Sequence, residues 1–149
     1  MLHLVKLCVG IATIEELVER QLAHYKQGKR LCHITRMTPS RSEELLRGGS
    51  LYWVIKHRLC VRQRLTAIEP FRDADGVRRC RLVLAPQLVR VVARRRRPFQ
   101  GWRYLPHAAA PPDKPGQEAL IGVEEGAARR ARDGLPPELE QALDDIGVR

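Results

Sequence analysis

Residues 50–68 read SLYWVIKHRLCVRQRLTAI, and their pattern predicts the centre of the sheet. From Ser50 onward the side-chain pattern changes to a period of two, and aromatic and β-branched residues become frequent, which is typical of strands. The stretch therefore predicts two strands, Leu51–Lys56 and Leu59–Ile68. Asp73-Ala-Asp-Gly76 is a strong turn signal, and Arg79–Leu84 after it alternates basic and apolar residues. We expect an antiparallel meander of three strands.

Upstream of the meander, the sequence predicts a strand, a helix and a second, shorter strand. Leu2–Val9 is fairly apolar on both of its alternating faces, so we place this strand inside the sheet. Thr13 followed by Glu16 is a capping box, and apolar residues then recur at helical spacing until Gly28 can end the helix. Cys32–Met37 is a short candidate strand, because the Thr-Pro dipeptide that follows it favours extended geometry.

A second helix is expected immediately before the meander. Ser40 with Glu43 repeats the capping-box pattern, and Leu45 with Leu46 supplies a buried side. Two consecutive glycines follow and can stop the helix. After the meander, Pro86 breaks the pattern and a further strand is expected over residues 88–92. The segment 94–105 then closes the ordered part of the chain.

The fold class that these elements predict is α+β, with a small barrel-like antiparallel sheet flanked by two helices, Thr13–Gln27 and Ser40–Arg47. After Pro106 the composition shifts to Ala, Pro and Gly, which is typical of a linker. We therefore divide the chain into a basic α+β domain, residues 1–106, and a linker with a disordered acidic tail, residues 107–149. Within the tail, Pro136–Ile146 has the spacing of a short acidic amphipathic helix.

Charge is distributed unevenly along the 149 residues, whose formal net charge is +10. Residues 1–107 carry 22 Lys and Arg against eight Asp and Glu, whereas residues 108–149 carry five against nine. Arginine accounts for 22 of the 27 basic residues, and its planar guanidinium suits bidentate contact with phosphates. A GC-rich genome also favours Arg over Lys, but such codon usage does not account for the scarcity of acids in the first part. The imbalance predicts binding to RNA or another polyanion.

One concentration of basic residues lies on the predicted meander. Residues two apart on a strand share a face, so Arg62 with Arg64, and Arg79 with Arg81, each project from one side. If those sides coincide, the sheet presents a guanidinium surface, to which Lys56 adds a charge. The alternative is a solvated sheet face that is balanced by nearby acids, namely Glu69, Asp73 and Asp75.

A second concentration is Arg94–Arg97, which runs into Pro98-Phe-Gln-Gly-Trp-Arg-Tyr104. Arginines interleaved with aromatic rings suit single-stranded nucleic acid, because charge contacts the backbone and flat rings stack on bases. The alternative is that the rings pack into the core and the arginines are solvated. The predicted nucleic-acid-binding residues of both concentrations are Lys56, Arg62, Arg64, Arg79, Arg81, Arg94, Arg95, Arg96, Arg97, Trp102, Arg103 and Tyr104.

No motif indicates catalysis, a cofactor or a metal. The five histidines lack metal-ligand spacing, and the four cysteines are scattered without a Cys-x-x-Cys pair, as expected of reduced core residues. The apolar runs are shorter than the ~20 residues that a spanning helix needs, so we expect no membrane span. The N-terminus lacks the order of a secretory signal, which favours a cytoplasmic location.

Several segments resemble a known family. They are Leu2–Gly10, Thr35–Met37, Glu44–Lys56, Arg62-Gln63 and Arg97–Leu105. Together they are similar to a domain-of-unknown-function family, number 1489, that is common in alphaproteobacteria, and the likeness covers about residues 2–105. The resemblance implies no assigned activity. Family members are expected to read Ile-Lys-Gly after the Tyr-Trp strand, and His57 stands here instead of the glycine, which argues against a catalytic role for His57.

A second resemblance is architectural. A helix ending in Leu-x-x-Gly-Gly, then a strand and a basic meander, is similar to the pseudouridine-synthase-and-archaeosine-transglycosylase (PUA-like) barrels and their activating-signal-cointegrator-homology (ASCH-like) relatives. That likeness implies RNA binding, reading of a modified base, or hydrolysis of a modified nucleoside by a Lys, Thr and Glu set, for which Lys56, Thr66 and Glu69 are present. RNA binding is our leading expectation. The alternatives are a modified-nucleoside or nucleotide hydrolase using Lys56 and Glu69, and a protein-interaction module.

Overall fold

A computed structural model of the protein describes residues 1–115. The expected acidic helix over Pro136–Ile146, and the rest of the predicted tail from residue 116, lie outside these residues. The described part is a mostly-sheet α+β fold with seven strands and two α-helices. In chain order its elements are β1 (Leu2–Leu7), α1 (Ile14–Lys26), β2 (Leu31–Thr35), α2 (Ser42–Leu45), β3 (Ser50–Ile55), β4 (Arg58–Arg72), β5 (Arg78–Leu84), β6 (Val89–Arg95), β7 (Trp102–Pro106) and a 3-10 helix, η1 (His107–Ala109).

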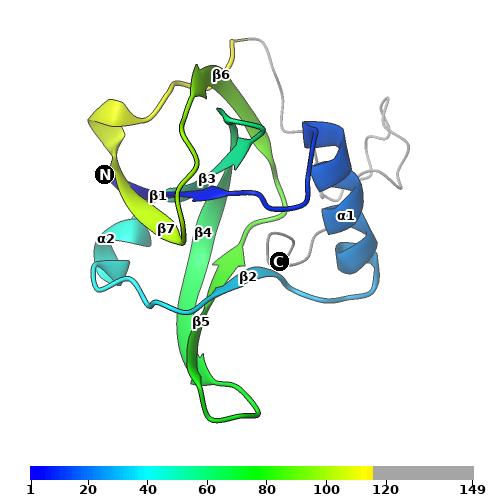
Figure 1. Cartoon of the computed structure of the whole chain (residues 1–149), viewed down its shortest axis with the longest axis vertical. Coiled ribbons are helices and arrows are strands. Elements are labelled where there is room, and N and C mark those ends of the chain that lie inside the picture. Colours follow the sequence, from blue (N-terminus) through cyan, green and yellow to red (C-terminus); the bar gives the residue numbers. More distant parts are fainter. Residues whose placement is uncertain (116–149) are drawn as a thin grey trace.

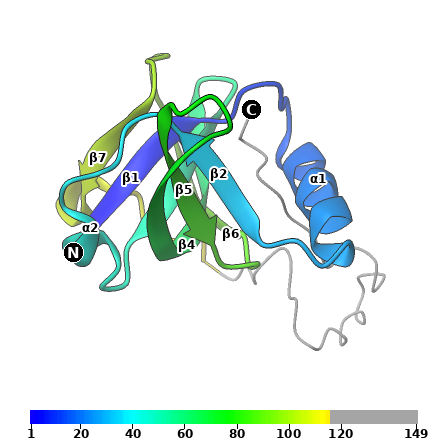
Figure 2. The same cartoon turned by 90° about the horizontal axis from the view of Figure 1, so that it is seen from below.

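The sheet is organised around the long strand β4 (Figures 1 and 2), and the two halves of this strand pair with different neighbours. The first half of β4 pairs with β3 on one edge and with β6 on the other, and the second half pairs with β5. A register irregularity between Leu65 and Ala67 separates the halves. Pairing runs in the order β2-β5-β4-β3-β1-β7, with β6 beside β4, so the sheet of the described residues is open. The meander β3-β4-β5 is confirmed.

The expectation of a purely antiparallel sheet is wrong at one pair of strands. β1 and β3 are parallel, with Leu4 opposite Leu51 and Leu7 opposite Val54. The chain between them passes through α1, β2 and α2, and such a crossover is what a parallel pair requires. β1 lies between β3 and β7, which confirms its predicted place inside the sheet.

The first helix begins and ends as its sequence signals predict. The Thr13 hydroxyl accepts a hydrogen bond from the Glu16 amide at 3.1 Å, and the Glu16 carboxylate accepts one from the amide of Ala12. Gly28, just beyond the helix, adopts the left-handed conformation with φ 78°. Leu17 is fully buried, so α1 covers the core at the side of the sheet away from β7 (Figures 1 and 2).

The second helix is shorter than expected. It begins after Arg41, and no side chain caps it, because the Ser40 hydroxyl lies 3.4 Å from the Tyr104 hydroxyl instead. Leu45 is fully buried but Leu46 is 37% exposed, so the predicted two-leucine buried side is wrong for the second leucine. The tertiary contact with β7 thus displaces the expected capping box.

Two hydrophobic clusters occupy the two faces of the central strands. The main cluster includes Leu4, Leu51 and Trp53, and the second includes Val5 and Tyr52. Successive residues of a strand point to opposite faces, so β1 and β3 are buried on both sides. Tyr52 and Trp53 therefore belong to different clusters, as their alternation predicts.

The described chain continues to pack on the sheet after β7. We call residues 107–114 the strap. The amide of His107 donates to the Met1 carbonyl at 3.1 Å, and the amide of Val92 donates to the Pro112 carbonyl at 2.9 Å. Asp113 forms an isolated antiparallel bridge with Val91. The strap thus holds the N-terminus and β6 together, beyond Pro106, where the composition changes.

Candidate polyanion-binding surface and a second polar pocket

A cluster of basic residues lies where the β3–β4 turn meets the end of β6. We call it the basic end, and its cleft of about 350 Å³ is lined by Lys56, His57, Arg58, Ala93, Arg94 and Arg95. Lys56 and His57 form the turn between the paired residues Ile55 and Arg58, and both have positive φ, 50° and 67°. Two-residue hairpins favour this geometry because it matches the strand twist.

Strand pairing brings the remaining members of the basic end together. Arg58 lies opposite Arg95, and the amide of Arg96 donates to the His57 carbonyl at 2.8 Å. Within residues 1–115, none of Lys56, Arg58, Arg94 and Arg95 forms an ion pair with an acid. Within residues 1–115, the Arg94 guanidinium donates to the Ala109 carbonyl of the strap, at 3.2 Å. These like charges are therefore held side by side without compensation by the described acids.

Arginines continue from the basic end toward β7 around one aromatic ring. The Arg96 and Arg103 guanidinium carbons lie 5.1 and 5.3 Å from the centroid of the Phe99 ring, within the range of cation–π contact. Phe99 also packs against the second hydrophobic cluster. Arg97 is exposed beside it. Phe99 is thus the aromatic ring that lies beside Arg96 and Arg103.

Trp102 and Tyr104 lie on the other face of β7 and make internal contacts. The Trp102 indole donates to the Met37 carbonyl at 2.9 Å, and the Tyr104 hydroxyl accepts from the Arg41 amide at 3.1 Å. Both rings pack against the main cluster. The structure therefore separates Trp102 and Tyr104 from Arg103, because successive strand residues alternate in direction.

The arginines of β5 are balanced by acids. Arg79 pairs with Asp73 at 2.7 Å. The Glu69 carboxylate forms ion pairs with Arg30, at 2.8 Å, and with Arg81, at 3.7 Å. These guanidinium groups hold the pKa of the Glu69 carboxyl below its usual range. Asp73 likewise has a lowered pKa, chiefly through its hydrogen bond from Arg79. This part of the predicted surface matches the alternative of a balanced sheet face.

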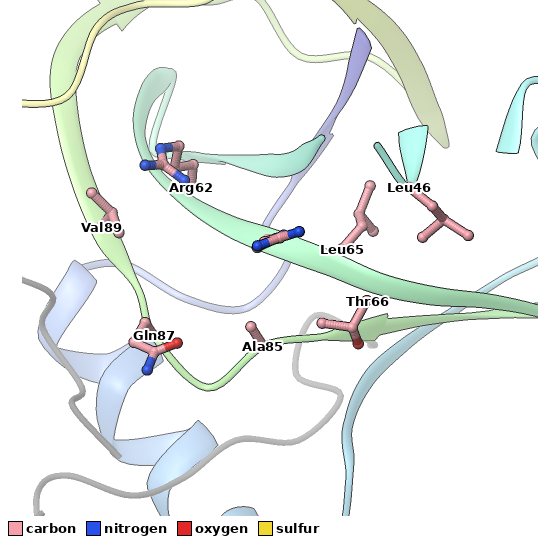
Figure 3. Close-up of a pocket in the computed structure, with 8 residues that line it drawn as sticks. Leu46, Arg62, Leu65, Thr66, Ala85, Gln87 and Val89 are labelled. Atoms are coloured by element: carbon pink, nitrogen blue, oxygen red, sulfur yellow. The ribbon is translucent and has the colours of Figure 1, made fainter. Parts of the chain in front are cut away.

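Arg62 and Arg64 point outward from the first half of β4 and line a cavity of about 420 Å³. Figure 3 shows Arg62 and Thr66 on β4 facing Gln87 and Val89 across this cavity. Arg62 forms a bidentate pair with Asp113 of the strap, at 2.7 and 2.8 Å, and donates to the Ser50 hydroxyl at 3.2 Å. The pair raises the pKa of Arg62 and lowers that of Asp113. Within residues 1–115, Arg64 has no acidic partner.

The residues proposed for a hydrolase are not brought together. Lys56 lies at the basic end, Thr66 lines the cavity beside Arg62, and Glu69 is bound by Arg30 and Arg81. In the described part of the chain no group of three His, Cys, Asp or Glu residues could hold a metal ion. No helix there is long and apolar enough to cross a membrane.

Sequence reasoning missed a second polar pocket, beneath the strap. Its volume is about 380 Å³, and its polar lining comprises His3, Ser50, Tyr52, Arg62, His107 and Asp113. We call it the strap cavity. His3 is buried, and its pKa is lowered to about 4, first by burial and then by the charges of His107, Arg62 and the N-terminus. These residues come together only through contacts between distant parts of the chain, so no local sequence motif indicates the pocket.

The fold and the basic end together define a basic, mostly-sheet α+β protein with a cationic surface that the acids of residues 1–115 do not compensate. The chain belongs to the family described as Protein of unknown function (DUF1489), whose model matches residues 4–149. Comparison with curated proteins and with solved structures found no match.

Proposed function

We propose that the protein binds RNA and that the basic end contacts its phosphates. The observation that carries the proposal is the cluster of Lys56, Arg58, Arg94 and Arg95 around one cleft, none of which pairs with a described acid. Holding like charges together costs free energy unless a counter-charge neutralises them, and a polyanion supplies several phosphates at once. Arg96, Arg97 and Arg103 extend the same charge toward β7.

Phe99 supports single-stranded RNA as the form of polyanion, because an aromatic ring beside arginines offers a stacking surface to an unpaired base. Trp102 and Tyr104 would first have to release Met37 and Arg41 before stacking on a base. In this proposal Arg62, Arg64, Arg79 and Arg81 are secondary contacts. The likeness to PUA-like barrels, whose members include RNA-binding domains, points the same way.

The chain offers a matched pair of variants for the test. Arg58 lies opposite Arg95 at one end of β4, and Arg72 lies opposite Arg78 at the other. All four side chains are exposed, so the double variants Arg58→Gln/Arg95→Gln and Arg72→Gln/Arg78→Gln remove the same charge from similar environments. Only the first pair belongs to the basic end.

Fluorescence anisotropy with a labelled single-stranded RNA, measured over a range of salt concentrations, provides the readout. Losing two phosphate contacts should reduce the slope of log affinity against log salt by about 1.4 and weaken binding roughly tenfold. We expect this of the basic-end variant and not of the control. Equal losses in the two variants would mean that net charge alone binds the RNA, and equal affinity for DNA of the same sequence would contradict a preference for RNA.

A further inference from the structure

The strap cavity lies between the sheet and the strap, on the face of β3 that carries Ser50 and Tyr52. Its floor comes from β1, β3 and β4, and its cover comes from His107 to Asp113. Ser50 and Tyr52 are 1% and 3% exposed and lie in the floor, whereas His107 and Asp113 of the cover are exposed, so the strap cavity is partly open to water.

Hydrogen bonding determines which ring nitrogen of His3 and of His107 carries the proton. The Ser50 amide donates to Nδ1 of His3 at 3.0 Å, so neutral His3 carries its proton on Nε2. That nitrogen lies 2.9 Å from Nδ1 of His107, to which it donates. Neutral His107 therefore carries its own proton on Nε2, where it is a hydrogen-bond donor. His3 is a positioning residue in this arrangement.

The other polar groups of the cavity are also donors. Arg62 can only donate, and the hydroxyl of Ser50 already accepts from it, which leaves the Ser50 proton available. Tyr52 also lines the cavity, and its phenolic hydroxyl can donate a hydrogen bond. Four donor groups around one cavity suit an acceptor-rich, negatively charged ligand.

Asp113 shows that this position accepts an oxyanion. Its two carboxylate oxygens accept hydrogen bonds from two nitrogens of the Arg62 guanidinium, in the bidentate geometry that arginine also uses for phosphate. A carboxylate offers two oxygens, whereas a phosphomonoester offers three and so matches the additional donors Ser50, Tyr52 and His107 better. Asp113 is about half exposed and belongs to the strap, so it can be displaced without unfolding the sheet.

We propose that the strap cavity binds the phosphomonoester group of a small ligand of nucleotide type, in competition with Asp113 for Arg62. The strap is then both the cover of the site and its internal competitor. The proposal does not depend on the basic end, because no residue lines both the strap cavity and the cleft of the basic end.

Titration of the full chain with inorganic phosphate and with AMP, followed by amide chemical shifts in NMR, tests this proposal. We expect saturable shifts at Ser50, Tyr52 and His107 with both probes. Similar affinities would identify free phosphate as a sufficient ligand, and tighter binding of AMP would identify a nucleotide. Absence of saturable shifts at these residues with both probes would overturn the proposal.

Three variants locate the binding and keep the test informative. Tyr52→Phe removes only the hydroxyl and should weaken AMP binding about tenfold, whereas Tyr25→Phe on α1 should not change it. Asp113→Asn removes the competitor and should tighten binding about two- to fivefold, as expected for a partly exposed ion pair. Unchanged affinity in either cavity variant, with the fold intact by circular dichroism, would contradict the proposal.

The basic-end variant Arg58→Gln/Arg95→Gln separates this proposal from RNA binding. It should leave AMP binding intact while weakening RNA binding. Loss of AMP binding in this variant would assign the ligand to the basic end and overturn the strap-cavity site. RNA binding that fails in the wild-type protein, with AMP binding retained, would overturn the proposed function alone.

Discussion

Acidification should destabilise the protein through His3. Its pKa is lowered from 6.5 to about 4 in the folded protein, so the unfolded chain binds a proton that the folded chain does not. The stabilisation is therefore complete above the unfolded pKa and is lost as the pH falls from 6.5 toward 4. From these two pKa values, the free energy of unfolding should drop by about 2 kcal/mol between pH 7 and pH 5.

Urea unfolding of the wild-type protein and of His3→Asn at pH 7, 6 and 5 measures this contribution. The Asn side chain can still accept from the Ser50 amide but does not titrate, so the variant should lose about 2 kcal/mol less over the same range. Glu44, Glu69, Asp73 and Asp113 have pKa values below the usual range and should destabilise the protein only at lower pH. His57→Asn at the exposed β3–β4 turn is the control. The same pH dependence in the wild-type protein and in His3→Asn would refute this role of His3.

Three further substitutions test the fold, each by urea unfolding at pH 7. Replacing His57 by Gly should stabilise the protein by about 0.5–1 kcal/mol, because His57 has a left-handed backbone that glycine adopts without strain, and a loss of stability would contradict this. Gly49→Ala should cost several kcal/mol or prevent folding, since an added Cβ would lie 2.3 and 2.4 Å from the carbonyl oxygens of Leu2 and Leu45; wild-type stability would show that the backbone relaxes. Gln63→Leu should cost about 3 kcal/mol, because Gln63 bonds Gln21, the Trp53 indole and the Ala85 carbonyl, all of which would lose a buried partner. A cost below 1 kcal/mol would mean that water replaces these bonds.

Local patterns predicted most of the secondary structure because they report backbone geometry directly. The period of two over residues 50–68 is the period of the strand itself, and the β3–β4 hairpin follows it. The Thr13 and Glu16 pair satisfies amides within one helical turn, so its signal is complete without tertiary contacts. The same signal at Ser40 failed because Tyr104, 64 residues away in the sequence, lies beside that serine.

Faces and charge partners were harder to predict, because they depend on long-range pairing. On β4, the even-numbered residues Arg62 and Arg64 point outward before the register irregularity between Leu65 and Ala67. Beyond this irregularity, the odd-numbered Glu69 lies opposite Arg81 of β5. Alternation alone therefore could not show which arginines would meet acids. The partner of Arg62 is Asp113, which lies in the segment whose composition predicted a linker.

By itself, the sequence determined the strands, the first helix and the excess of positive charge, because each depends on residues that are close together in the chain. Which of these charges the described acids balance depends on the tertiary structure. Strand pairing places Arg58 beside Arg95, gives Arg79 and Arg81 acidic partners, and places Trp102 and Tyr104 on the opposite face of β7 from Arg103. It also assembles His3, Tyr52 and His107 into one cavity, since β1, β3 and the strap meet only in the folded protein.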